Sequence, residues 1–509
     1  MRAIVAATKR RWGRVLLGLA IAAIAVVALS PFLGRALYPV ATRWLLTGPR
    51  LRAMINAQPQ YLLLDWGEAV SEKPGHLTIK NLSIRGSDPN VQWIIRLADA
   101  DVEFNLSSLL RRTFRVTTLR GSGLSFFLRN KIKPELLKTT DVSVLPPVPG
   151  FSDPPLRSPD DRFPPPDPKA FLIDVRSVAV EHFDDIWVDA YHYQGGARVD
   201  GSFLLKPALH AQIGPAKLTF ASGEMKIGKA PDGITVVGAI TATFDPFAPL
   251  EHQDAKVFEV ITAQVKLEGS FQKLDALAPL FEVYGTRLEG GTGKATIDAA
   301  IDHGIASGGI VAAVRNAVVR LNNTTLQGNA DIDLKIPKWN LVSGPIDVSG
   351  TSVAISDARE FRSTDPKRWS GRFAFPTARI DVTSTGTVQA KVQDARPLLA
   401  VLGAPLPGWT KPLVNLKELT GGARATLGPS VVRIQDLDAK GESFHLQGHF
   451  VREKGKTDGA LLIESGILSV GVEMDGKKTT VRPLFAKQWY EKQGKESAGG
   501  AKAGAKEKK

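Results

Sequence analysis

The chain has 509 residues, 43% of them hydrophobic, and it contains no cysteine. The absence of cysteine excludes disulfides, cysteine-ligated zinc and thiol catalysis, and it suits an oxidising envelope compartment. The formal net charge of +14 is concentrated at the two ends of the chain, so the nearly neutral body has no basic face for nucleic acid. We expect the basic ends to meet anionic lipid headgroups or to be solvated tails.

The first predicted element is an uncharged apolar run, Val15–Leu33, which as a helix is long enough for a hydrocarbon core of roughly 30 Å. Basic side chains precede it, which predicts that this end stays in the cytoplasm. The competing interpretations are a cleaved signal peptide and a buried soluble helix. The run is longer than a signal peptide usually has, and Ser30 leads directly into Pro31, an awkward cleavage context. We therefore predict an uncleaved single-pass anchor, residues 1–34, in a bacterial inner membrane, with the bulk of the chain periplasmic.

Residues 35–130 are predicted to form an N-terminal periplasmic region. Its first part reads as helical or mixed, and from about residue 76 the hydrophobic pattern has a period of two, which predicts β-strands. One long strand is predicted from Val91 through Leu106. Its apolar positions change phase at Ala98–Asp99, which predicts a β-bulge there.

Residues 131–170 interrupt the strands with a proline-rich stretch that includes Pro164-Pro165-Pro166. Proline fixes φ and donates no backbone hydrogen bond, so this stretch is excluded from helices and central strands. We predict a loop or linker of polyproline character, with a ligand for a polyproline-binding module as the alternative.

Strands resume at Phe171 and continue to residue 486, in an elongated region with a weak internal repeat. A short helix is predicted at Asp275–Gly285 and again at Asp394–Gly403, each followed by a Gly-rich strand start near Leu288 and Leu419. The last part, residues 487–509, is predicted to be a disordered tail of Lys, Gly and Ala.

The fold class predicted is therefore all-β: an N-terminal transmembrane helix, then a long, mostly antiparallel curved sheet or groove with a few short helices. Strict alternation means that each strand has one apolar and one wet face. Alternation does not distinguish a dry sandwich core from an open apolar groove. That choice stays open at this point.

In order along the chain, the anchor is followed by three segments with strand-like patterns: His76–Gly86, Asp99–Leu110 and Arg115–Arg129. With the proline-rich gap and the long β region behind them, these segments resemble the AsmA-like family of bacterial envelope proteins, relatives of TamB and of the bridge-like β-groove lipid-transfer proteins. The resemblance implies an inner-membrane protein that projects into the periplasm and carries or channels phospholipids. It implies no catalytic residues.

Residues that could carry chemistry are few. His182, Asp184, Asp185, Asp189 and His192 could ligate a metal only if two strands brought them together, and solvated strand faces explain them as well. The same holds for His445 and His449. The segment Gly291–Lys294 fails the phosphate-loop pattern, which requires Gly where Leu288 stands and Ser or Thr where Ala295 stands. We predict no enzyme, no metal and no cofactor.

The predicted function is binding or channelling of phospholipids between membranes in support of the outer membrane, with membrane lipids as partners and an outer-membrane or periplasmic protein as a further partner. The alternatives are an assembly factor for outer-membrane proteins that acts by edge-strand pairing, and an envelope hydrolase. The residues predicted to line a lipid groove share alternating apolar positions, and ordinary core is the alternative for each: Val102, Phe104, Leu106, Leu124, Phe126, Leu128, Leu218, Phe220, Val265, Leu267, Ile332 and Leu334.

Overall fold

The structure, a computed structural model, describes most of the chain from residue 61 to residue 493. The described residues are 61–135, 145–158, 161–163, 165–281, 286–321, 324–342, 344–361, 368–380, 384–394, 417–428, 431–442, 444–453, 456–476, 478–482 and 484–493, with Tyr38, Thr42, Leu46, Arg52, Ala53 and Asn56. The predicted anchor, Val15–Leu33, lies outside them. The all-β prediction is confirmed, because the described residues are mostly in strands and every strand pairing is antiparallel.

Two compact units divide the chain: Met1–Leu136, Val148–Ile186 and Arg198–Ala211 form the first, and Leu137–Pro147, Trp187–Ala197 and Gln212–Lys509 the second. The strands of the first unit are β1 (Leu62–Asp65), β2 (Glu68–Val70), β3 (His76–Ser87), β4 (Val91–Asn105) and β5 (Thr113–Asn130). Three strands contribute to both units: β6 (Leu172–Val188), β7 (Tyr191–Lys206) and β8 (His210–Ile227).

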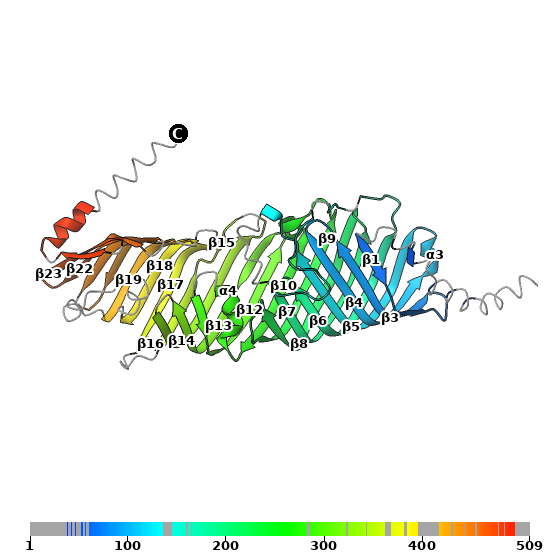
Figure 1. Cartoon of the computed structure of the whole chain (residues 1–509), viewed down its shortest axis with the longest axis horizontal. Helices are drawn as coiled ribbons and strands as arrows, with labels where there is room; N and C mark the ends of the chain where they lie inside the picture. Colours follow the sequence, from blue (N-terminus) through cyan, green and yellow to red (C-terminus); the bar gives the residue numbers. More distant parts are fainter. Residues whose placement is uncertain are drawn as a thin grey trace, which may run out of the picture. The chain divides into compact units, whose positions relative to one another are not determined.

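The second unit is a sheet whose long strands pair in chain order, as Figure 1 shows from green β9 to orange β23. Its strands are β9 (Ile234–Phe247), β10 (Ile261–Phe271), β11 (Thr286–Glu289), β12 (Thr292–Asp302), β13 (Ile305–Leu321), β14 (Thr324–Asn340), β15 (Ile346–Asp347), β16 (Thr351–Glu360), β17 (Trp369–Ile380), β18 (Ser384–Asp394), β19 (Lys417–Leu427), β20 (Val431–Lys440), β21 (His445–Glu453), β22 (Lys456–Ser465), β23 (Leu468–Asp475) and β24 (Lys478–Arg482).

The labelled helices are short and lie between strands: α3 (Leu106–Leu109), η3 (Asp254–Val260), η4 (Leu274–Leu277) and α4 (Ala278–Phe281). Residues 486–493, which follow β24, are also helical, as are Tyr38, Thr42, Leu46, Arg52 and Ala53 before β1. η4 and α4 confirm the helix predicted from Asp275, whereas its second copy, Asp394–Gly403, lies outside the described residues after Asp394. Leu288 and Leu419 are both buried at the matching strand starts, and the repeat itself stays a prediction.

The first unit confirms the predicted phase shift in β4, but the predicted β-bulge is wrong, because β4 keeps one register with β3 and with β5 across Ala98–Asp99. Leu97 and Ala100, three residues apart, are both buried in one cluster with Val180 of β6. Asn81 on one side of Ala98 and Gly123 on the other have φ of 53° and 65°, in the left-handed region that Asn and Gly tolerate best. In β3, β4 and β5, the alternation of side chains between the two faces of the sheet therefore changes phase at the same level.

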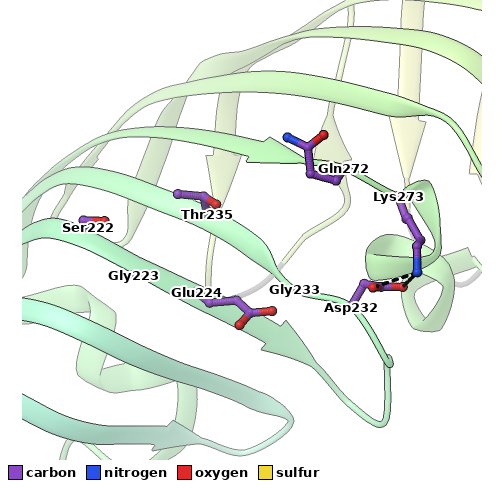
Figure 2. Close-up of a pocket in the computed structure, with 8 residues that line it drawn as sticks. All are labelled: Ser222, Gly223, Glu224, Asp232, Gly233, Thr235, Gln272 and Lys273. Carbon is purple, nitrogen blue, oxygen red and sulfur yellow. Dashed lines mark hydrogen bonds and ion pairs between the residues drawn. The ribbon is translucent and has the colours of Figure 1, made fainter.

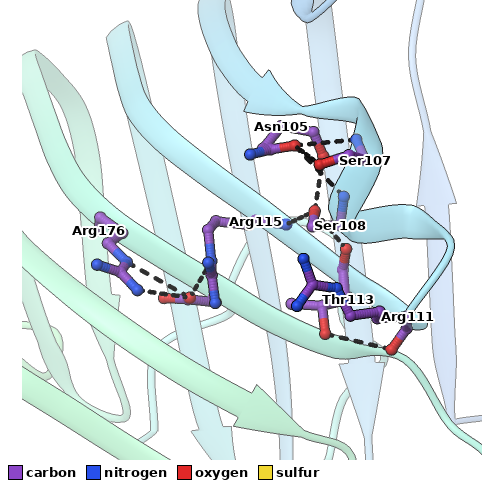
Figure 3. A network of polar contacts seen from close by, with 8 residues as sticks. Asn105, Ser107, Ser108, Arg111, Thr113, Arg115 and Arg176 are labelled. Atoms are coloured by element: carbon purple, nitrogen blue, oxygen red, sulfur yellow. Dashed lines mark hydrogen bonds and ion pairs between the residues drawn. The ribbon is translucent and has the colours of Figure 1, made fainter.

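The prediction that Leu106 continues β4 is wrong, because the chain turns into α3 at this residue. Asn105 is the cause: its side-chain oxygen accepts hydrogen bonds from the backbone N–H groups of Ser107 and Ser108, which caps the helix start (Figure 3). The Ser108 hydroxyl then donates to the carbonyl oxygen of Thr113 at 2.8 Å and closes the turn into β5. Leu106 is exposed as a result.

The proline-rich stretch is a strap on the first unit rather than a free linker. Val148 is only 2% exposed, and Gly150 lies against Ile94 and Arg96 on the face of β4 opposite Leu97. Two ion pairs hold the strap to the end of β5: buried Arg129 pairs with Asp153, and Lys131 pairs with Asp161 at 3.0 Å. Together these contacts bury Ile94 and Phe127, which period-two alternation places on the wet face.

Strands also begin before residue 76, because β1 and β2 both pair with β3. At the other end, the predicted disordered tail is wrong for residues 487–493, which are helical. The reason is that Trp489 lies over Gly471 of β23 and Arg482 lies over the Trp489 ring at 5.4 Å, so this segment has a sheet surface to cover.

Candidate functional site

One face of the second unit is apolar from β9 to β23. Residues that pair across antiparallel strands lie on the same face of the sheet, so the register traces this face from strand to strand. We call it the apolar face. Its central row takes one residue from each long strand: Val236, Gly269, Ala295, Ala312, Ile332, Val353, Phe373, Ala390, Gly421, Ala439, Leu446, Ile463 and Val470.

The opposite face of the same strands is polar. One residue along, the register connects Thr235, Ser270, Lys294, Ala313, Asp331, Ala354, Arg372, Lys391, Thr420, Lys440, His445, Glu464 and Ser469. In β12 the contrast is regular, because Lys294, Thr296 and Asp298 are exposed while the residues between them are half-buried. The sheet therefore turns one wet and one apolar face to its surroundings.

The apolar face is not a dry core over its middle part. From β10 to β17, the side chains of Leu267, Ile297, Ile310, Leu334 and Val353 are half-buried, as expected where neighbours flank them on the sheet but no second layer lies on top. Next to the strand ends, near η4, Phe271 is buried with Leu274 and Ala276. The uncovered part therefore lies along the middle of these strands, and the strand ends near η4 are packed.

Over the last strands the same face is closed. Val392, Leu419, Leu446, Leu461 and Val472 belong to one buried cluster, and Leu446 is 3% exposed. Its remaining members are Ala439, Phe444, Phe450, Ile463 and Met474, with Phe373, Ile434, Leu437 and Val470 packed against them. The apolar face thus changes from uncovered to closed between β17 and β19.

Four of the predicted lining residues lie on the uncovered part. Val265 and Leu267 of β10 pair with Ala299 and Ile297 of β12, and they are half-buried. Ile332 and Leu334 of β14 pair with Ala312 and Ile310 and are half-buried as well. Leu218 and Phe220 of β8 are also half-buried, and the Phe220 ring packs edge-on against Tyr193 with 4.9 Å between centroids.

The predicted lining residues of the first unit have three different outcomes. Val102 is buried in a cluster with Val116 and Val175, and Phe104 packs against this cluster, so both are ordinary core. Leu124, Phe126 and Leu128 pair with Leu97, Ile95 and Trp93 on a single face and are half-buried. Leu106 lies in α3 and is on neither face.

Several residues of the uncovered part were not predicted as lining. They are Ile297, Ile310 and Val353. Alternation marks the segments of Ile297 and Val353 only briefly, and the apolar run around Ile310 in β13 hides it. What was missing is the register, which places these residues beside Leu267 and Ile332.

A separate small hollow of about 330 Å³ is polar and lies at the strand ends of β8, β9 and β10. Ser222, Gly223, Glu224, Asp232, Gly233, Thr235, Gln272 and Lys273 line it (Figure 2). Asp232 and Lys273 pair with each other at 3.1 Å, so their charges are satisfied within the hollow. No large apolar side chain lines it, so it is not suited to a lipid tail.

The predicted metal candidates are strand and turn residues. His182 has φ of 59° and is exposed within β6, whereas the His192 ring stacks on Trp187 with 3.8 Å between centroids. His445 donates from Nε2 to the carboxylate of Asp438 at 2.9 Å, and His449 lies near Tyr490. Within the described part of the chain, no three His, Asp or Glu side chains are placed to share an ion.

Gly291–Lys294 spans the start of β12 and is no phosphate loop. Lys294 is exposed in the middle of the antiparallel pairing with β13. A strand in this position directs successive backbone N–H groups to its neighbours, so they do not converge on an anion.

Family models, curated proteins and solved structures give no match to this chain. The described helices include none with the length and apolar character needed to cross a membrane. The function must therefore be argued from the faces of the sheet.

Proposed function

We propose that this protein binds and channels phospholipids between two membranes, as the AsmA-like resemblance implies, and so supports the outer membrane. In this proposal Val15–Leu33 anchors the chain in the inner membrane and the sheet lies in the periplasm. The protein is then a lipid carrier without catalytic residues or cofactors. The observation that carries the proposal is the uncovered part of the apolar face, from β10 to β17, opposite a polar face that keeps the sheet in water.

The size of the uncovered part suits an acyl chain. The long strands β10, β12, β13, β14, β16 and β17 are neighbours, and at about 4.8 Å per strand they extend over roughly 24 Å. Half of a bilayer's hydrocarbon core, the length that one acyl chain occupies, is roughly 15 Å. A tail laid across these strands would gain about 0.8 kcal/mol for each CH₂ that the face shields. Such a surface needs no special residue type.

The proposal predicts that the apolar face, and not the sheet as such, holds lipid. Ile297→Glu puts a charge in the middle of the uncovered part, whereas Thr296→Glu puts the same charge on the polar face one residue away. We expect the first variant to lose most of its co-purified phospholipid in native mass spectrometry of the full chain, and the second to keep it. Both variants should keep the wild-type circular dichroism spectrum.

A lipid-free wild-type chain, or equal lipid in both variants, would rule out the apolar face as the binding surface. A photo-crosslinker in place of Leu267 should capture lipid, and one in place of Leu446, within the closed cluster, should not. Labelling of equal strength at both positions would also contradict the proposal.

The second candidate function, assembly of outer-membrane proteins by edge-strand pairing, is favoured by β24. Among the described strands, β24 pairs only with β23, so one of its edges carries unpaired backbone groups. Successive backbone N–H groups of a strand point to opposite sides, so either Thr479 or Thr480 directs its N–H away from β23. Proline at that residue removes one hydrogen-bond donor from the free edge of β24. If this candidate is right, one of these two proline variants lowers the yield of folded outer-membrane proteins while lipid content is unchanged.

A further inference from the structure

Four large apolar side chains are exposed together at one end of the last strand hairpin. Ile467 is 103% exposed, Leu484 75%, Phe485 73% and Leu468 55%. Single exposed hydrophobic residues are common on soluble proteins, but groups of them mark contact surfaces. We call these four residues the apolar tip.

The register shows that the tip is one place. Ser465 pairs with Leu468, so Gly466 and Ile467 form the turn between β22 and β23. Arg482 pairs with Gly471, and the chain that follows β24 therefore runs toward that same turn. Lys487 confirms the arrangement, because its ammonium lies 2.8 Å from the carboxylate of Glu464, the neighbour of Ser465.

The strands behind the tip are covered on both faces. On the apolar face, Leu461 and Val472 are buried in the closed cluster. On the polar face, Trp489 of the helical segment 486–493 lies over Gly471, and Leu462 is 2% exposed beneath it. Figure 1 shows this red helix beside β22 and β23. The tip therefore projects from a rigid, packed support, and its exposed side chains have no core of their own.

We propose that the apolar tip inserts shallowly into an anionic lipid surface. Charge supports this occupant: the acidic neighbours Glu464 and Glu473 are paired with Lys487 and Arg482, and from Gln488 to Lys509 the sequence has six further Lys against three Glu. Apolar side chains flanked by basic groups are the usual composition of a segment that binds at the interface of an anionic membrane. Two narrow turns also offer too little area for a stable protein interface. The closed cluster separates the tip from the uncovered part of the apolar face, so this proposal stands whether or not the sheet carries lipid.

The chain has no cysteine, so single labels can be placed without removing native thiols. Ile467→Cys carries an environment-sensitive NBD label at the tip, and Asp475→Cys carries it at the opposite end of β23. The full chain, held in phosphatidylcholine nanodiscs, is mixed with vesicles of phosphatidylcholine alone or with phosphatidylglycerol added. We expect NBD emission at residue 467 to rise severalfold and shift to the blue with the anionic vesicles, and emission at residue 475 to stay constant.

A matched substitution tests the tip side chains themselves. Replacing Leu484 and Phe485 by Ser in the Ile467→Cys background should abolish most of the rise, whereas Val311→Ser, at an exposed apolar residue elsewhere, should leave it unchanged. No rise at residue 467, an equal rise with neutral vesicles, or a rise that depends on protein concentration without vesicles would each overturn the proposal. The last of these would identify a second copy of the chain as the occupant.

Discussion

Small residues sit at the centre of the apolar face and set how closely its strands and any ligand approach. They form two runs in the central row, Gly269, Ala295 and Ala312 in the first and Ala390, Gly421 and Ala439 in the second, with larger side chains between the runs. At Gly421 the space is already filled, because a Cβ there would lie 2.3 Å from the Cα of Ala439. At Gly269 a Cβ would lie 3.2 Å from Cγ2 of Ile234, so glycine permits a close approach in the uncovered part as well.

Gly421→Ala should destabilise the closed part of the sheet by about 1–3 kcal/mol, since the added methyl group must displace backbone. Urea unfolding followed by circular dichroism measures this. Gly196→Ala is the matched control, because the nearest atoms to its Cβ would be at 3.6 and 3.7 Å, an ordinary contact. An equal effect at both positions would mean that loss of glycine flexibility, and not the close approach to Ala439, governs the result.

His449 makes the stability of the last strands depend on pH. Burial lowers the pKa of His449 below its ordinary value of 6.5, so the folded state binds the proton less readily than the unfolded state does. Its contribution to stability is complete above the unfolded pKa and is lost as the pH falls. The free energy of unfolding of the wild type minus that of His449→Gln should therefore decrease as the pH falls from about 8 to about 5.

His303 provides the control of opposite sign. Hydrogen bonds with Asp245 and Asp302 raise the pKa of His303, so its contribution is present at low pH and is lost as the pH rises. The hydrogen bond with His445 is the chief cause that lowers the pKa of Asp438 below its ordinary value of 3.8. Asp438 therefore changes its charge only at pH values below the range in which His449 and His303 are compared. If His449→Gln and His303→Gln change the pH dependence in the same direction, the burial account of His449 is incorrect.

At the scale of elements, the strap over β4 and β5 depends on a buried ion pair. Arg129 is 3% exposed, and its partner Asp153 lies on the strap. Asp153→Asn therefore leaves the buried positive charge of Arg129 without the negative charge that pairs with it. Because the carboxylate itself is 45% exposed, we expect a loss of about 1–3 kcal/mol rather than the full cost of a buried pair. Loosening of the strap should speed tryptic cleavage after Arg157 and Arg162.

The pair Arg424–Asp436 is the matched control, because both side chains are mostly exposed. Asp436→Asn should change stability by less than about 1 kcal/mol and leave cleavage of the strap unchanged. Wild-type cleavage rates in Asp153→Asn would show that the burial of Val148, and not the ion pair, holds the strap.

Element identity followed from the sequence where period two was sustained, and failed where a single local contact decided the outcome. The strands around Ile332 and Leu267 were predicted correctly because alternation over many residues leaves one solution. Leu106 fits the same alternation, but the Asn105 cap outweighs one residue of pattern. The strap and the segment 487–493 were missed for a related reason: proline or charge content describes how a segment behaves alone, and Asp153 and Trp489 find partners distant in sequence.

At the scale of the whole molecule, the sequence predicts that apolar faces exist but not whether they are covered. Leu267 and Leu446 both stand in alternating strands, yet Leu267 is half-buried and Leu446 is 3% exposed. The difference arises from partners distant in sequence, because Leu446 is buried in one cluster with Val392 and Leu419, and no local pattern encodes these contacts. Of the predicted lining residues, Val265, Leu267, Ile332 and Leu334 lie on the uncovered part, whereas Val102 belongs to a core.

The contrast between the uncovered and the closed parts predicts a contrast in local stability. Strands with few buried apolar contacts open at lower free energy than strands in a packed core, so amide hydrogens of β12 and β13 should exchange faster than those of β21 and β22. A ligand that binds only the folded state adds stability where it binds. Adding phospholipid to the delipidated full chain should therefore slow exchange from β10 to β17 and leave β21 and β22 unchanged. Slowing in both regions would indicate that lipid stabilises the sheet globally, and slowing in neither would mean that the uncovered face does not hold acyl chains.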